Sequence, residues 1–141
     1  MLAEFANGAR GTFETSRTFV GPESRMAFEL YGTAGAVAWN FERMNELKVY
    51  VTTDAPLSGY TTVFSGDRFP HHGVFVPGNA NAIGFEDIVT IEDFEFLQAV
   101  ASGVPHSPGF REALDYVSVQ QALVTSWQSQ RWEDVVTLQT P

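Results

Sequence analysis

Apolar side chains alternate with polar or small side chains along most of the first half of the chain. Successive residues of a strand point to opposite faces of a sheet, so this period of two predicts β-strands. The alternation marks strands at residues 12–19, 26–31, 36–41, 47–51 and 60–64, all inside a strand-rich region that spans 8–65. Gly32 and Gly35 bracket a short connection and can adopt positive φ, which predicts a hairpin turn. Short connections favour antiparallel neighbours, because a parallel pair needs a crossover of about a dozen residues.

Residues 66–86 lack this alternation and predict a long irregular loop. They hold four glycines, two prolines, two histidines and two asparagines. A structureless stretch of this length is uncommon inside a compact domain, and such loops often carry function. We therefore expect ligand contacts in this loop.

The rest of the chain has the spacing of helices, across residues 90–130. Thr90 lies three residues before the carboxylate of Asp93, which predicts a capped helix start. Gly103 predicts the end of that helix, and Ser107–Pro108 predicts the start of a second one, with Ser107 as the capping residue. Residues 132–138 are expected to form a short terminal strand. This order predicts an α+β fold, with an open, predominantly antiparallel β-sheet, helices packed on one face, and a single domain over 1–141.

Charge and composition narrow the classes of partner. The formal net charge of −9 makes nucleic acid a poor partner, because the surface repels phosphates. The chain contains no cysteine, which excludes disulfides, thiolate nucleophiles and zinc–thiolate sites. No apolar run approaches the roughly 20 residues of a membrane span, and the first residues lack the pattern of a secretory leader. We expect a cytoplasmic protein without membrane partners.

Several segments carry a resemblance when taken in order. They are Asn7–Thr12, Tyr31–Ala36, Trp39–Leu47, Pro77–Gly78, Ile83–Asp87, Asp93–Leu97, Pro108–Ala113 and Arg131–Val135. Together they resemble the C-terminal domain of the Gfo/Idh/MocA family of NAD(P)-dependent oxidoreductases. The resemblance implies an open-sheet domain that lines the substrate cleft, acts on sugars, cyclitols or related polyols, and builds dimers or tetramers by packing sheets together. Residues 42–47 look most like those of members that act on inositols.

The resemblance also implies what this chain does not carry. The family's glycine-rich dinucleotide loop, its Glu-Lys-Pro lysine and its Asp-x-x-x-His pair have no counterpart here. A dinucleotide site needs a glycine-rich turn that leads from a strand into a helix, whereas Gly32–Gly35 connects two predicted strands. We therefore expect a truncated or isolated substrate-binding and oligomerisation domain that has no catalytic residues, binds no cofactor and is inactive alone. In the intact enzyme the cofactor would be NAD or NADP, held by a Rossmann partner. The alternative is a stand-alone, non-catalytic ligand-binding or association module, or a remnant that still folds.

Five residues are predicted to contact a polyol substrate: His71, His72, Asn79, Asn81 and Arg17. Imidazole, amide and guanidinium groups supply the hydrogen bonds that hydroxyls need. Asn79 and Asn81 could equally serve a turn, and Arg17 could pack its stem while its head reaches water. A metal site at the two histidines is disfavoured, because neighbouring side chains of extended backbone diverge.

Aromatic residues of the strands predict an interface. Trp39, Phe41 and Tyr50 are expected on the sheet face that helices do not cover, where a second copy would bury them. The carboxylates of Glu86 and Asp87 are adjacent, so we expect a structural role at the helix start in place of acid–base chemistry.

Overall fold

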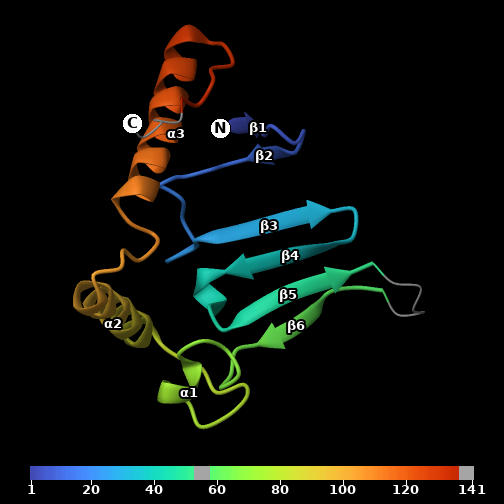
Figure 1. Cartoon of the computed structure of the whole chain (residues 1–141). Helices are drawn as coiled ribbons and strands as arrows, with labels where there is room; N and C mark the ends of the chain where they lie inside the picture. The colour runs from blue at the N-terminus through green and yellow to red at the C-terminus, as the bar shows by residue number, and fades with distance from the viewer. Residues whose placement is uncertain (53–57, 137–141) are drawn as a thin grey trace. The chain divides into compact units, whose positions relative to one another are not determined.

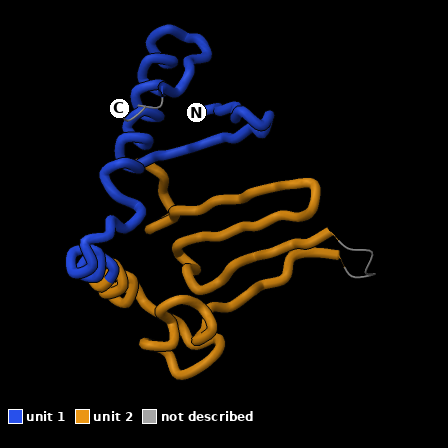
Figure 2. Tube along the Cα trace, in the orientation of Figure 1, with its two compact units in different colours: residues 1–17, 95–141 blue, residues 18–94 orange. Residues whose placement is uncertain are grey.

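The computed structural model describes residues 1–52 and 58–136, and the chain divides into two compact units. Unit 1 comprises Met1–Arg17 and Glu95–Pro141, and unit 2 comprises Thr18–Phe94 (Figure 2). Among the described residues, no helix is both long and apolar enough to cross a membrane.

Unit 2 contains a four-stranded antiparallel sheet. Its strands are β3 (Ala27–Gly32), β4 (Gly35–Asn40), β5 (Glu46–Val51) and β6 (Thr61–Phe64), and they neighbour one another in chain order (Figure 1). The 3₁₀ turn η1 (Phe41–Arg43) connects β4 to β5. Gly32 and Gly35 pair across the predicted hairpin turn. The predicted antiparallel sheet is confirmed, and its boundaries lie within one or two residues of those predicted.

The strand register gives this sheet two chemically different faces, because residues directly opposite each other share a face. The apolar face carries Phe28, Leu30, Val37, Trp39, Leu47, Val49, Val51, Thr61 and Val63. The polar face carries Glu29, Tyr31, Ala36, Ala38, Glu46, Lys48, Tyr50, Thr62 and Phe64. On the polar face, a hydrogen bond to Glu29 raises the pKa of Tyr31 to about 12, so its hydroxyl stays protonated.

The three aromatic residues predicted for one interface do not share a face. Trp39 pairs with Leu47 on the apolar face, whereas Tyr50 pairs with Ala36 on the polar face. Phe41 lies on the apolar side with Trp39, at a ring-centroid distance of 6.0 Å. Phe41 also contacts Phe85 edge-on at 6.2 Å, and this contact joins the sheet to the next helix.

Two helices begin in unit 2; the first lies wholly, and the second with its first two residues, in the segment 66–86 predicted to be an irregular loop. They are α1 (His72–Phe75) and α2 (Phe85–Ser102), of which α2 ends in unit 1. The predicted start of a helix at Thr90 is wrong. Asp87 starts the helix earlier, because its carboxylate accepts a 2.7 Å hydrogen bond from the Gly84 N–H. The Thr90 hydroxyl lies inside α2 and donates to the carbonyl of Glu86 at 2.9 Å.

Unit 1 contains a small hairpin, the end of α2, and a long helix. The hairpin strands are β1 (Leu2–Glu4) and β2 (Arg10–Thr12), and the helix is α3 (Phe110–Ser129). The strand predicted over residues 12–19 is wrong beyond Thr12. β1 pairs with residues 10–12, and Phe13 adds hydrogen bonds to Met1, but residues 14–19 continue no strand of this hairpin. Alternation alone does not make a strand. Residues 132–136 form no strand, and the last two residues of that prediction lie outside the described residues.

A carboxylate also organises the start of α3. Gly109 is the N-cap, and its N–H donates to Glu112 Oε2 at 2.7 Å. The Ser107 hydroxyl donates to Glu112 Oε1 at 2.9 Å, so Ser107 supports the helix through Glu112 and is not itself the cap. The backbone hydrogen bond from Gly109 is the main reason that the pKa of Glu112 lies below its usual range.

Most large apolar side chains of the described residues are exposed to solvent. Val76 and Ile83 are the buried hydrophobic side chains there, at 7% and 8% exposure. Large side chains such as Phe110 and Trp127 are 94% and 74% exposed. Large contiguous apolar patches on protein surfaces often mark interaction sites.

Candidate functional site

The loop between β6 and α2 is held at both ends by one asparagine side chain. Asn45 Nδ2 donates to the carbonyl of Ile83 at 2.9 Å, and Asn45 Oδ1 accepts from the Ile83 N–H at 3.0 Å. The Ser65 hydroxyl donates to the same oxygen at 2.7 Å. The amide of Asn45 therefore pairs with Ile83 as a neighbouring strand would, and it fastens both ends of the loop to the sheet.

Backbone contacts bring the two ends of the loop close together. The Ser65 N–H donates to the carbonyl of Asn45, and the Ala80 N–H donates to the carbonyl of Ser65. Gly66 is buried against Asn79, and a Cβ at Gly66 would lie 2.7 Å from Asn79 Oδ1. Val76 and Ile83 are buried within the same segment. The loop is thus a compact excursion with its own small core, a construction typical of functional surface loops.

The two histidines lie next to each other in this loop but have different surroundings. His71 adopts a left-handed conformation with φ of 64°, which is uncommon for a residue other than glycine and is often found at functional sites. Its ring packs edge-on against Phe94 at 6.1 Å. His72 Nδ1 lies 3.1 Å from the carbonyl of Pro70, which favours the tautomer protonated at Nδ1. That tautomer presents Nε2 of His72 as an acceptor for a ligand hydroxyl.

The remaining predicted substrate residues divide between turn and surface roles. Asn81 Nδ2 donates to the carbonyl of Gly78 at 3.0 Å, which is the turn role considered as its alternative. Asn79 is exposed beside Gly66. Arg17 is exposed in unit 1, outside any strand, so its predicted mid-strand position is wrong. The two histidines and the two asparagines thus lie in one loop of unit 2, with different local partners.

The acidic residues of this region serve the start of α2. Asp87 accepts from Gly84 as described above, and Glu86 lies beside it in the first turn. Within residues 1–52 and 58–136, no three histidine, aspartate or glutamate side chains gather as a group that could hold a metal ion. The structural role predicted for Asp87 is borne out by its hydrogen bond to Gly84.

The starts of the two long helices carry carboxylates where a dinucleotide site would place a phosphate. A pyrophosphate needs free N–H groups at a helix N-terminus, approached through glycines. At α2 and α3 the N–H groups of Gly84 and Gly109 already donate to Asp87 and Glu112. Carboxylates at these positions also repel a phosphate, so neither long helix offers a cradle for one.

Asn45 is the structurally central residue that sequence reasoning missed. It follows η1 as one asparagine among several, and its partner Ile83 lies 38 residues further along the chain. A usable signal was present, since Asn45 directly precedes β5 and lies between the apolar Met44 and, two residues on, the apolar Leu47. A polar residue in such a position needs a hydrogen-bonding partner.

Comparisons with known proteins identify relatives along nearly the whole chain. No family model matches the sequence. Levoglucosan dehydrogenase of Pseudarthrobacter phenanthrenivorans is 34% identical over 135 residues, which are 95% of this chain and 35% of the relative. The chain therefore spans about one third of the length of this curated relative.

Solved structures give the same result. A levoglucosan dehydrogenase in complex with NADH and L-sorbose matches with a TM-score of 0.91 and 33% identity, over 97% of this chain and 37% of that one. An NAD-binding oxidoreductase from Klebsiella pneumoniae matches with a TM-score of 0.86 and 30% identity, over 96% of this chain and 37% of that one. The chain is therefore homologous to Gfo/Idh/MocA-type oxidoreductases over about one third of their length, consistent with their C-terminal domain.

Proposed function

We propose that this chain is the substrate-binding and oligomerisation domain of an NAD(P)-dependent oxidoreductase that acts on a sugar or polyol. In this proposal residues 1–141 act as one domain, and the cofactor is held by other polypeptide. The observation that carries the proposal is the match over 97% of this chain to a dehydrogenase whose structure contains NADH and a sugar. The filled helix N-termini support the absence of a cofactor site in this chain.

Within this proposal the loop between β6 and α2, which Asn45 fastens to the sheet, supplies substrate contacts. Nε2 of His72 would accept a hydrogen bond from a substrate hydroxyl, since Nδ1 faces the carbonyl of Pro70. The exposed side-chain amide of Asn79, in the same loop, would supply a donor and an acceptor. Hydride transfer and proton transfer would need groups that this chain does not carry, so its own residues bind and orient the substrate.

Titration with levoglucosan tests this role. We expect the ring signals of His72 to shift in NMR spectra, and the His72→Ala variant to bind about tenfold more weakly, the equivalent of one lost hydrogen bond. The His106→Ala variant is the matched control, because His106 pairs with Glu95 outside the loop. A titration that leaves the His72 signals unchanged, or saturable binding of NADH by this chain alone, would contradict the proposal.

We also propose that a second copy of the chain packs on the polar face of the sheet. On that face Glu29, Ala38 and Lys48 form one row across β3, β4 and β5. A two-fold axis that runs along β4, between two facing sheets, places β3 of one copy over β5 of the other. Glu29 then faces Lys48 of the second copy, and the small side chain of Ala38 on the axis lets the sheets approach to about 10 Å.

The next row on the polar face has the same symmetry. Tyr31, Ala36 and Tyr50 lie across the same three strands, so Tyr31 of one copy would face Tyr50 of the other. Tyrosine is enriched in interfaces because it combines a large apolar ring with a hydrogen-bonding group. Of the three aromatic residues predicted for an interface, Tyr50 is the one that belongs to this arrangement.

A charge exchange tests this packing. We expect Lys48→Glu to weaken self-association about tenfold or more, because it places like charges opposite each other twice in the symmetric pair. The double variant Glu29→Lys with Lys48→Glu should recover the affinity. Sedimentation velocity measures the association, with Glu14→Lys as a control outside the sheet. A wild-type chain that remains monomeric at high concentration, or a double variant without recovery, would exclude this axis.

A further inference from the structure

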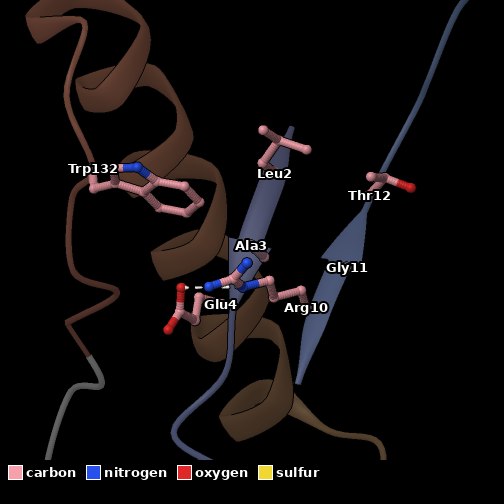
Figure 3. A pocket seen from close by; sticks show the side chains of 7 residues that line it. All are labelled: Leu2, Ala3, Glu4, Arg10, Gly11, Thr12 and Trp132. Atoms are coloured by element: carbon pink, nitrogen blue, oxygen red, sulfur yellow. Dashed lines mark ion pairs between the residues drawn. The ribbon is translucent and has the colours of Figure 1, made fainter. Parts of the chain in front are cut away.

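An open cleft of about 570 Å³ lies within unit 1, between the β1–β2 hairpin and Trp132. The strand pairs Leu2–Thr12 and Glu4–Arg10 place four side chains on one face of the hairpin. The backbone of Ala3 and Gly11 completes that wall. Figure 3 shows the indole of Trp132 facing the hairpin from the opposite side. The cleft thus has one flat aromatic wall and one wall with hydrogen-bonding groups.

The polar groups of the cleft are available to a ligand. Arg10 Nε lies 3.6 Å from Glu4 Oε2, which is longer than a hydrogen bond. The side chains of Arg10 and Glu4 are 81% and 54% exposed, so much of their donor and acceptor capacity faces the solvent. The Thr12 hydroxyl adds a further donor and acceptor on the same face.

The charges of the cleft select for a neutral ligand. Glu4 offsets the charge of Arg10, and the chain as a whole has a net charge of −9, so a phosphate would gain little at this site. A ligand that fits needs one flat apolar face for the indole and a rim of hydroxyls for the carboxylate and guanidinium. A pyranose with equatorial hydroxyls has both, because its axial C–H groups make a flat apolar face and its hydroxyls point outward around the rim.

We propose that this cleft binds a neutral saccharide, stacked on Trp132, with its hydroxyls hydrogen-bonded by Glu4 and Arg10. The site uses no residue of the loop between β6 and α2. It would bind a sugar whether or not that loop contacts a substrate.

Titration of the whole chain with methyl β-glucoside tests the site. We expect the indole N–H signal of Trp132 to shift saturably in NMR spectra. Trp132→Ala should weaken binding about tenfold or more, Glu4→Gln should weaken it severalfold, and Trp132→Phe should retain part of the affinity. Trp127→Ala is the matched control, because Trp127 is an exposed tryptophan on α3 of the same unit and does not line the cleft. All substituted side chains are exposed, and circular dichroism checks that each variant folds.

Three outcomes would overturn the proposal. The Trp132 signal stays unmoved at saturating sugar, the Trp132→Ala variant binds as well as the wild type, or adenosine displaces the sugar and marks the cleft as a site for a nucleobase. Shifts of the His72 signals without shifts of Trp132 would reject this site and leave the proposed function standing. The reverse result would support the cleft and count against the loop as the substrate site.

Discussion

Replacing Gly35 by alanine is expected to destabilise the sheet of unit 2 by about 3 kcal/mol, at the upper end of the usual cost of overpacking. Gly35 begins β4 and pairs with Val51 of β5. A Cβ at this position would lie 2.2 Å from the carbonyl oxygen of Tyr50 and 3.3 Å from the Cα of Val51. These are backbone atoms that cannot rotate away, so the substitution must push β4 and β5 apart.

Gly32→Ala provides a matched control for this prediction. Gly32 is the partner of Gly35 in the same hairpin, and a Cβ there would meet only the carbonyl oxygen of Gly35, at the ordinary contact distance of 3.7 Å. Urea unfolding should therefore separate the two variants by about 2 kcal/mol or more. Equal stability of the two variants would show that β4 and β5 are not paired in the observed register.

Replacing Asn45 by alanine is expected to cost about 2–3 kcal/mol of unfolding free energy. The substitution removes three hydrogen bonds, to the N–H and carbonyl of Ile83 and to the Ser65 hydroxyl. The net contribution of each is about 1 kcal/mol, and the Ile83 backbone groups would lose partners in a half-buried place. Urea unfolding measures the loss, and hydrogen exchange of the Ile83 amide should accelerate in the variant.

Asn81→Ala is the control for the hydrogen bonds by which Asn45 holds the loop. Asn81 lies in the same loop and bonds the carbonyl of Gly78, but it is exposed, so its removal should cost less than about 1 kcal/mol. If Asn45→Ala proves no more costly than Asn81→Ala, the loop is not held by Asn45. These hydrogen bonds of Asn45 matter for function, because the loop that carries His71 and His72 depends on them for its position relative to the sheet.

The two faces of the sheet show what the alternation of residues can predict: which side chains of one strand share a face, but not how two strands align. The sequence placed Phe28 and Leu30 on one face of their strand, and the structure agrees. It did not show that Trp39 and Tyr50 belong to opposite faces, because that depends on how two strands align across a turn. The same limit explains residues 13–19, where the alternation is regular but the strand pairing of β1 with β2 extends only over residues 10–12.

The helix starts show a second kind of limit. Thr90 and Asp93 have the spacing of a capping pair, and so do Gly84 and Asp87, which the structure uses. Spacing alone does not choose between them. The edge-on contact of Phe85 with Phe41 favours the earlier start, since the later start would leave Phe85 outside the helix.

The sequence by itself determined the antiparallel strands of unit 2, the Gly32–Gly35 turn and the kinship with Gfo/Idh/MocA-type oxidoreductases, because these rest on local patterns and on residue order. Only the tertiary structure decided the two faces of the sheet, the partner of Asn45 38 residues away, and the cleft between Trp132 and the hairpin. Each of these joins segments that are distant in the chain. Their alignment follows from hydrogen-bond register and packing, which no local pattern of residues specifies.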